Sequence, residues 1–200
     1  MDARAWDDRY LDPERISRTD PNQFVVESVS GLAPGRALDL ACGEGRNSLW
    51  LAGLGWEVTG VDWSEVAIGR ARERSAEQGL DVTWQRQDLF AWTPPEQAFD
   101  LVLIVYLQVP GDQRRLVWGR AAAAVAAGGR LVVIGHDIRN HGSGTGGPRS
   151  PEVLYRPEEV AETIGGDLEV VEAAVVRRPV EIDGEIRHAI DNRVVAVRRT

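Results

Sequence analysis

Hydrophobic and polar residues are arranged along the chain in short blocks that predict strands and helices in alternation. Apolar runs with few polar residues predict strands over residues 37–41, 58–61, 82–87, 99–107 and 131–135. Between these runs, apolar residues recur at helical spacing, and they predict helices over residues 49–54, 66–78 and 121–127. Strands that alternate with helices are typical of parallel strands joined by right-handed crossovers. The pattern therefore predicts a Rossmann-like, doubly wound α/β sheet.

The last third of the chain departs from this alternation. Residues 136–155 are rich in Gly, Ser, Pro and Arg and exceed an ordinary connector in length, which indicates a functional loop or, alternatively, a disordered one. A short helix over 158–164 leads into apolar runs over 168–176 and 190–197, and the dipeptide Asp183-Gly184 predicts a turn between them. Two strands without an intervening helix predict an antiparallel hairpin at one edge of the sheet.

Length and composition fit a single domain that spans residues 1–200. A chain of 200 residues that is 43% hydrophobic can bury a substantial core. Residues 1–34 alternate charged and aromatic positions, and a short amphipathic helix around Trp6 and Tyr10 is expected there. We expect residues 1–34 to form a helical cap on the main fold.

Charge and cysteine usage narrow the classes of function. The formal net charge of −8 leaves no basic excess to neutralise phosphates, so we expect no nucleic-acid partner. The single Cys42 can form no internal disulfide and leaves no Cys-rich metal site, which fits a reducing compartment. The chain shows no secretory leader and no apolar run of the roughly 18 residues that a membrane span needs. We therefore expect a cytoplasmic protein with no membrane association and no metal.

The turn after the first predicted strand has the composition of a ligand-binding turn. Small residues at Ala41, Gly43 and Gly45 let the backbone approach a ligand closely, and the helix that begins near Arg46 has free N–H groups at its start. Asp62 ends the second predicted strand, where a carboxylate can accept hydrogen bonds from both hydroxyls of a ribose. The combination predicts a nucleoside cofactor.

Two features favour S-adenosylmethionine over a nicotinamide dinucleotide. The dinucleotide fingerprint has a third Gly or Ala where this chain has Ser48. Asp39 and Glu44 flank the turn, and two unit charges about 4 Å apart interact by roughly 4 kcal/mol at an effective dielectric constant of 20. These carboxylates would repel a diphosphate and attract the ammonium and sulfonium groups of S-adenosylmethionine. A nicotinamide-dependent reductase stays as the rival enzyme class.

Further candidates follow the third and fourth predicted strands. Asp88 can accept from the exocyclic amine of an adenine, with Trp63 and Leu89 as apolar walls, or it is an exposed acid that starts a loop. Val105, Tyr106 and Gln108 are expected near the reactive end of the cofactor, where they can orient an acceptor. Tyr106 is alternatively a core residue.

The strings LDLACGEGRNSLWLA over residues 38–52 and VDWS over residues 61–64 resemble the class I S-adenosylmethionine-dependent methyltransferases, and within them the tellurite-resistance methyltransferase-like branch. The later motifs that carry the resemblance are Phe99-Asp100, Pro110, Gly128-Gly129, Gly135-His136-Asp137, Gly146-Gly147-Pro148 and Leu154-Tyr155. The resemblance implies a seven-stranded sheet that ends in an antiparallel hairpin. The candidate cofactor-binding residues are Asp39, Ala41, Cys42, Gly43, Gly45, Asn47, Asp62, Trp63, Asp88, Leu89 and Val105.

The sequence departs from this branch at two positions. Gln108 stands where many relatives have His, which puts an acid–base role there in doubt, and Ala41 replaces a glycine that is common in the turn. The reaction expected is a single in-line displacement that leaves S-adenosylhomocysteine, and positioning and exclusion of water can supply most of its catalysis. A non-catalytic domain that keeps the cofactor cleft for binding or regulation is the other alternative.

The acceptor is expected to be a small molecule, such as a thiol or a chalcogen oxyanion, and the expected acceptor side includes the loop over residues 136–157. The candidate catalytic residues are His136 and Tyr106. An alcohol or amine acceptor would need a base, which His136, Asp137 or His141 can provide, although His136 is alternatively a structural hydrogen-bond partner. Candidate acceptor-binding residues are Gln108, Arg139 and Arg149, of which the two Arg could clamp an anion or only keep the loop soluble.

Overall fold

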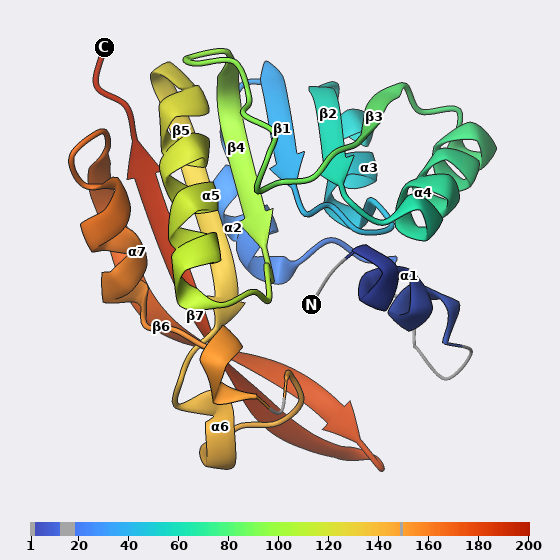
Figure 1. Cartoon of the computed structure of the whole chain (residues 1–200), viewed down its shortest axis with the longest axis vertical. Coiled ribbons are helices and arrows are strands. Elements are labelled where there is room, and N and C mark those ends of the chain that lie inside the picture. Colours follow the sequence, from blue (N-terminus) through green and yellow to red (C-terminus); the bar gives the residue numbers. More distant parts are fainter. Residues whose placement is uncertain (1–2, 13–18, 149) are drawn as a thin grey trace.

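Seven strands form one twisted sheet, which runs through the whole structure (Figure 1). The computed structural model describes residues 3–12, 19–148 and 150–200. The strand order is β3-β2-β1-β4-β5-β7-β6. The parallel strands are β1 (Arg36–Leu40), β2 (Glu57–Asp62), β3 (Val82–Arg86), β4 (Phe99–Val105) and β5 (Val125–His136).

The C-terminal strands β6 (Glu169–Ile182) and β7 (Glu185–Val197) form the antiparallel hairpin, and β7 pairs antiparallel with β5. The hairpin turns at Asp183 and Gly184, where the sequence predicts the turn. The predicted Rossmann-like, mostly parallel seven-stranded sheet with a C-terminal hairpin is confirmed.

Helices connect the strands and cover both faces of the sheet. Ser64 is the N-cap of α4, as predicted, and its hydroxyl accepts from the Ala67 N–H at 3.1 Å. Among the helices described, none combines the length and the apolar character that crossing a membrane requires. The helices are α1 (Ala3–Leu11), α2 (Gln23–Val29), α3 (Arg46–Gly53), α4 (Glu65–Gln78), α5 (Gly111–Ala124), α6 (Asn140–Ser143) and α7 (Pro157–Ile164), with a 3₁₀ turn at Pro151–Val153.

The core lies on both sides of the sheet because alternate residues of a strand point to opposite faces. Val102 and Ile104 of β4 pack in a cluster with side chains of α5 and α7. Leu101 and Leu103 pack on the other face in a cluster with α2 and α3. Both faces of β4 are therefore buried, as its near-continuous apolar sequence predicts.

Two element boundaries differ from the expectation. The helix predicted over 121–127 lies earlier, as α5 over Gly111–Ala124, because Val125 already pairs with Phe99 in the sheet. The hairpin strands are longer than the apolar runs predict. Their far ends pair only with each other and leave side chains in solvent, so no apolar pattern marks residues 177–189.

The loop over residues 136–157 is folded where the structure describes it. Asp137 and Tyr155 form a bridge across its base. Asn140 accepts from the Ile190 N–H at 2.8 Å and donates to the Gly146 carbonyl at 2.8 Å. These bonds join the loop to β7, so disorder does not describe this segment.

Candidate active site

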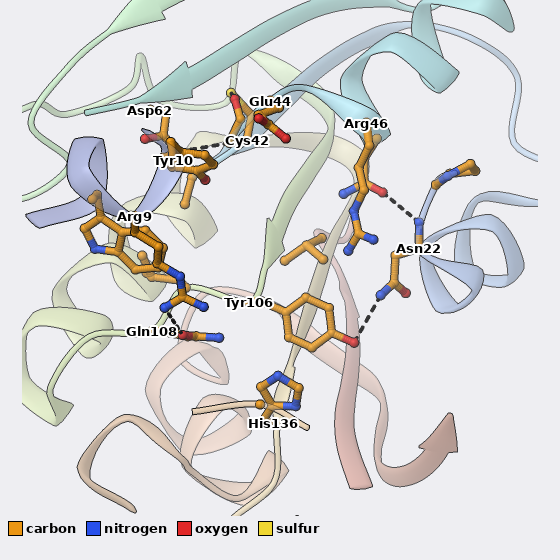
Figure 2. Close-up of a pocket in the computed structure, with 18 of the residues that line it drawn as sticks. Arg9, Tyr10, Asn22, Cys42, Glu44, Arg46, Asp62, Tyr106, Gln108 and His136 are labelled. Carbon is orange, nitrogen blue, oxygen red and sulfur yellow. Dashed lines mark hydrogen bonds between the residues drawn. The ribbon is translucent and has the colours of Figure 1, made fainter. Parts of the chain in front are cut away.

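A cavity of about 700 Å³ lies at the carboxyl ends of β1, β2, β4 and β5. β1 and β4 are neighbours at the point where the strand order reverses, which is where open α/β sheets bind ligands. The volume falls within the range of roughly 300–1,000 Å³ that is common for small-molecule sites. Figure 2 shows Asp62, Tyr10 and Cys42 at one end of this space, and Tyr106 and His136 at the other.

The first end is a glycine turn tied to a carboxylate. Gly43 and Ser64 donate their N–H groups to Asp62 Oδ2 and Oδ1, each at 2.9 Å. Ala41 has a φ of 58°, a left-handed conformation that explains the glycine common at this position in the branch. Burial raises the pKa of Asp62, and the backbone hydrogen bonds oppose this effect. The turn and the end of β2 therefore form one rigid unit.

The turn leaves its backbone open to the cavity. A Cβ on Gly43 would stand 2.7 Å from the Tyr10 hydroxyl of α1, and a Cβ on Gly45 would stand 2.3 Å from the ring of Trp84. Only glycine fits at these two positions without movement of the neighbouring rings. An open backbone beside the Asp62 carboxylate fits the ribose and methionine portions of S-adenosylmethionine.

The two other carboxylates near the turn are less available than the sequence suggests. Glu44 accepts from Arg70 Nη1 at 2.8 Å, and Arg74 lies 3.7 Å from its other oxygen. Asp39 is fully buried; its Oδ2 accepts from Ser48 and its Oδ1 has no hydrogen-bond partner among the described residues. Burial raises the pKa of Asp39 to about 7. The expected repulsion of a diphosphate is therefore weaker than the sequence argument assumes.

At the second end, four side chains from four strands share one buried hydrogen-bond cluster. His136 Nδ1 lies 2.8 Å from Asp191 Oδ1. Asp191 Oδ2 accepts from the Tyr106 hydroxyl at 2.7 Å and from Arg178 Nε at 2.8 Å. Asn22, which precedes α2, donates to the Tyr106 hydroxyl at 3.2 Å (Figure 2). We name His136, Asp191, Tyr106 and Arg178 the acceptor-end cluster.

Tyr106 occupies a strained position in this cluster. Its φ of 61° is left-handed, and its N–H donates to the Ile134 carbonyl of β5 at 2.8 Å. Such conformations cost about 1–3 kcal/mol and gather at functional sites. Burial and then the charge of Asp191 raise the pKa of Tyr106 to about 12, so its hydroxyl keeps its proton near neutral pH.

Helix α1 closes the cavity from the side of the turn. Asp7 accepts hydrogen bonds from the Ser64 hydroxyl and from the Val66 N–H at the start of α4. Arg9 donates to Gln108 beyond β4 at 3.4 Å, and Trp6 and Tyr10 line the space between these contacts. This position agrees with a cap formed by the N-terminal segment, and a lid motion stays a prediction.

The cavity brings together most of the candidate residues. Those that line it are Ala41, Cys42, Gly43, Asn47, Asp62, Trp63, Leu89, Val105, Tyr106, Gln108 and His136. Their functional roles stay predictions.

Four other candidates lie elsewhere in the structure. Asp39 and Gly45 lie behind the turn, Asp88 is exposed and accepts from the Phe90 N–H at 2.9 Å, and Arg139 pairs with Asp137 at 2.7 Å. Arg149 lies outside the described residues.

Sequence reasoning missed Arg178, Asp191 and Asn22. Arg178 lies beyond the apolar run that predicts its strand. Asp191 is a lone acid at the start of an otherwise apolar strand, and a buried acid in a strand needs a partner. That pattern could have marked Asp191 as a functional candidate, although it could not have named the partner.

Comparisons with known proteins agree with this fold and site. Residues 37–129 match the family model of the methyltransferase domain. The chain is 36% identical over 108 residues to the ubiquinone biosynthesis O-methyltransferase of Coxiella burnetii, which covers 53% of this chain and 45% of that protein. The chain thus spans less than half the length of the curated relatives it matches.

Two solved structures share the fold over nearly the whole chain. A structure from work on the conversion of a disulfide bond into a thioacetal group during echinomycin biosynthesis superposes with a TM-score of 0.80 at 22% identity, over 98% of this chain and 91% of that one. TehB from Haemophilus influenzae superposes with a TM-score of 0.74 at 21% identity, over 92% of this chain and 64% of TehB.

The domain match, the seven-stranded sheet and the glycine turn bound to Asp62 define the class of protein. The chain belongs to the class I S-adenosylmethionine-dependent methyltransferases. Within that class it is similar to TehB, with which it is 37% identical over 67 residues, 34% of this chain and 23% of TehB.

Proposed function

We propose that this chain transfers a methyl group from S-adenosylmethionine to a small nucleophile. The observation that carries the proposal is the single cavity that joins the glycine turn at Asp62 to the acceptor-end cluster at His136. A cofactor held at the first end and an acceptor held at the second would share one space, which α1 closes on one side.

The first end has the groups that S-adenosylmethionine needs. Asp62 can accept from ribose hydroxyls, the backbone at Ala41 and Gly43 is open to the ligand, and Trp63 and Leu89 offer apolar surface to an adenine. When bound, S-adenosylmethionine supplies an electrophilic methyl group on a sulfonium. The chain's own contribution is to position the acceptor and to exclude water.

Calorimetric titration with S-adenosylmethionine and, separately, with NADH tests the cofactor. We expect S-adenosylmethionine to bind. Asp62→Ala should weaken binding by about 1–3 kcal/mol, because hydrogen-bond partners lose their acceptor. Asp81→Ala is the matched control, since Asp81 is exposed at the opposite, amino end of β3. Binding of NADH alone would refute the proposal, and unchanged affinity in Asp62→Ala would remove Asp62 from the site.

Formation of S-adenosylhomocysteine separates an enzyme from a non-catalytic domain. We would incubate the protein with S-adenosylmethionine and a panel of thiols, phenols, amines, selenite and tellurite. Accumulation of S-adenosylhomocysteine with any of them would exclude a module that only binds the cofactor. Tight cofactor binding without turnover of any acceptor would favour that module instead.

A further inference from the structure

His136 has one ring nitrogen bonded and the other facing open space. Its Nδ1 bonds to Asp191 at 2.8 Å, whereas the part of the chain that the structure describes offers Nε2 no hydrogen-bond partner. The Nε2 edge faces Gly147, where an added Cβ would stand 3.1 Å from Nε2. His136 and Gly147 both line the cavity, so glycine at 147 keeps the approach to this edge open.

Asp191 fixes the tautomer of His136. Asp191 is fully buried, and its Oδ2 is already occupied by the donors of Tyr106 and Arg178. Burial alone would raise the pKa of Asp191, but hydrogen bonding to His136, the charge of Arg178 and the Tyr106 hydroxyl outweigh it and lower the pKa. An ionised Asp191 accepts from Nδ1–H, and the lone pair of the neutral ring is then on Nε2.

The other candidate bases are not free to act at this end. The Tyr106 hydroxyl donates to Asp191 and keeps its proton near neutral pH. Asp137 is fully buried and paired with Arg139, and neither Asp137 nor His141 lines the cavity. Of the groups considered from the sequence, only His136 brings a proton-accepting atom to the cavity.

We propose that His136 is the general base of this enzyme, that Asp191 is its positioning residue, and that the acceptor is a molecule with a neutral hydroxyl group, such as a phenol. This inference rests on the proposed methyltransferase function. A chalcogen oxyanion or a carboxylate is already ionised near neutral pH, and a thiol ionises close to it. A phenol has a pKa of about 10 and needs a base. Arg178 adds a positive charge near the phenolate that forms.

The proton and the electron pairs balance in one step. The O–H bond of the acceptor breaks and its proton passes to His136 Nε2. The oxygen electron pair forms the new O–CH₃ bond, and the pair of the broken C–S bond stays on sulfur in S-adenosylhomocysteine. Asp191 remains ionised and stabilises the imidazolium that forms, so no further reactant is needed.

The variant Asp191→Asn tests the positioning role directly. Tyr106 and Arg178 both donate to the position of Oδ2, so the carboxamide oxygen must occupy it and the NH₂ group must face His136 Nδ1. An NH₂ group can only donate there. His136 must then carry its proton on Nε2, where it can no longer accept one.

Nitrogen-15 NMR of the imidazole rings reads this tautomer without any substrate. The chain has three His residues, so assignment by His136→Gln is simple. We expect the Nδ1–H tautomer in the wild type and the Nε2–H tautomer in Asp191→Asn. Asp183→Asn is the matched control, because Asp183 is exposed at the hairpin turn with a φ of 52°, which Asn tolerates. A wild-type ring protonated on Nε2 would overturn the dyad.

Turnover tests the acceptor class. With 4-nitrophenol and catechol as probes, we expect S-adenosylhomocysteine formation in the wild type and a loss of about 100-fold or more in Asp191→Asn and in His136→Gln. Asp183→Asn should keep wild-type rates. Thermal unfolding of every variant is recorded first, and His136→Gln measures the same loss should Asp191→Asn not fold.

The outcomes separate this inference from the proposed function. Absence of S-adenosylmethionine binding would refute the methyltransferase, whatever the tautomer of His136. Cofactor binding with turnover of tellurite or selenite but of neither phenol would overturn the acceptor class alone. Equal phenol turnover in wild type and Asp191→Asn, with cofactor affinity unchanged in both, would overturn the role of Asp191.

Discussion

Replacement of Gly45 by alanine tests how the cofactor turn is built. Gly45 is the N-cap of α3 and has a φ of 79°, in the left-handed region. A Cβ at this position would stand 2.3 Å from Trp84 Cη2 and within 3.2 Å of two further ring atoms. The ring cannot easily retreat, because its Nε1 donates to Ser75 at 3.2 Å and its other edge lies against Gly60.

Two separate costs follow from this geometry. The left-handed conformation costs an L-residue roughly 1–2 kcal/mol. Overpacking against a held ring costs typically about 1–3 kcal/mol more. Gly45→Ala should therefore lower the free energy of unfolding by about 2–5 kcal/mol. Because the turn lies directly against the cavity, the variant should also weaken S-adenosylmethionine binding.

Gly55→Ala is the control that separates the two costs. Gly55 has a φ of 88° and nothing within 4 Å of an added Cβ, so it carries the conformational cost alone. Urea denaturation should give a loss of roughly 1–2 kcal/mol for Gly55→Ala, with unchanged cofactor affinity by calorimetry. A loss in Gly45→Ala no larger than in Gly55→Ala, or full cofactor affinity in Gly45→Ala, would show that Trp84 does not restrain the turn.

Two further substitutions near the turn have expected outcomes. The folded protein keeps a proton on Asp39 up to pH about 7 while the unfolded chain loses it near 3.8, so this group makes stability fall as pH rises between these values. Asp39→Asn should remove up to about 4 kcal/mol of that fall between urea titrations at pH 4.5 and 7.5, and an unchanged pH slope would contradict the buried proton. Ala41→Gly should relieve the left-handed strain and raise the unfolding free energy by up to about 1 kcal/mol, whereas a loss of stability would show that the strain is negligible.

The sequence predicted the cofactor end of the site because its determinants are local. The turn from Ala41 to Gly45 and the acid Asp62 each follow a strand directly, and parallel neighbours bring their carboxyl ends together. The hydrogen bond from Gly43 to Asp62 is the physical form of that adjacency. Such features need only strand order and composition.

Electrostatics at the turn could not be predicted in the same way. The sequence places Asp39 and Glu44 beside the cofactor turn, but it does not show that Arg70 and Arg74 of α4 pair with Glu44. Nor does it show that Asp39 is buried deeply enough to hold a proton near neutral pH. The preference for S-adenosylmethionine therefore rests on Asp62, the open turn and the family match rather than on repulsion of phosphate.

The acceptor end differs because none of its partners are neighbours in the sequence. Tyr106, His136, Arg178 and Asp191 come from β4, β5, β6 and β7, and they meet only because β7 inserts between β5 and β6. Asp191 lies opposite both His136 and Val176 in the strand register, so a shift of β7 by one residue would turn its carboxylate to the other face of the sheet. The C-terminal hairpin thus has a chemical as well as an architectural role, because its register places the carboxylate that orients His136. Substitutions that alter this register should change the acceptor reaction while the cofactor turn, built entirely from β1 and β2, still binds S-adenosylmethionine.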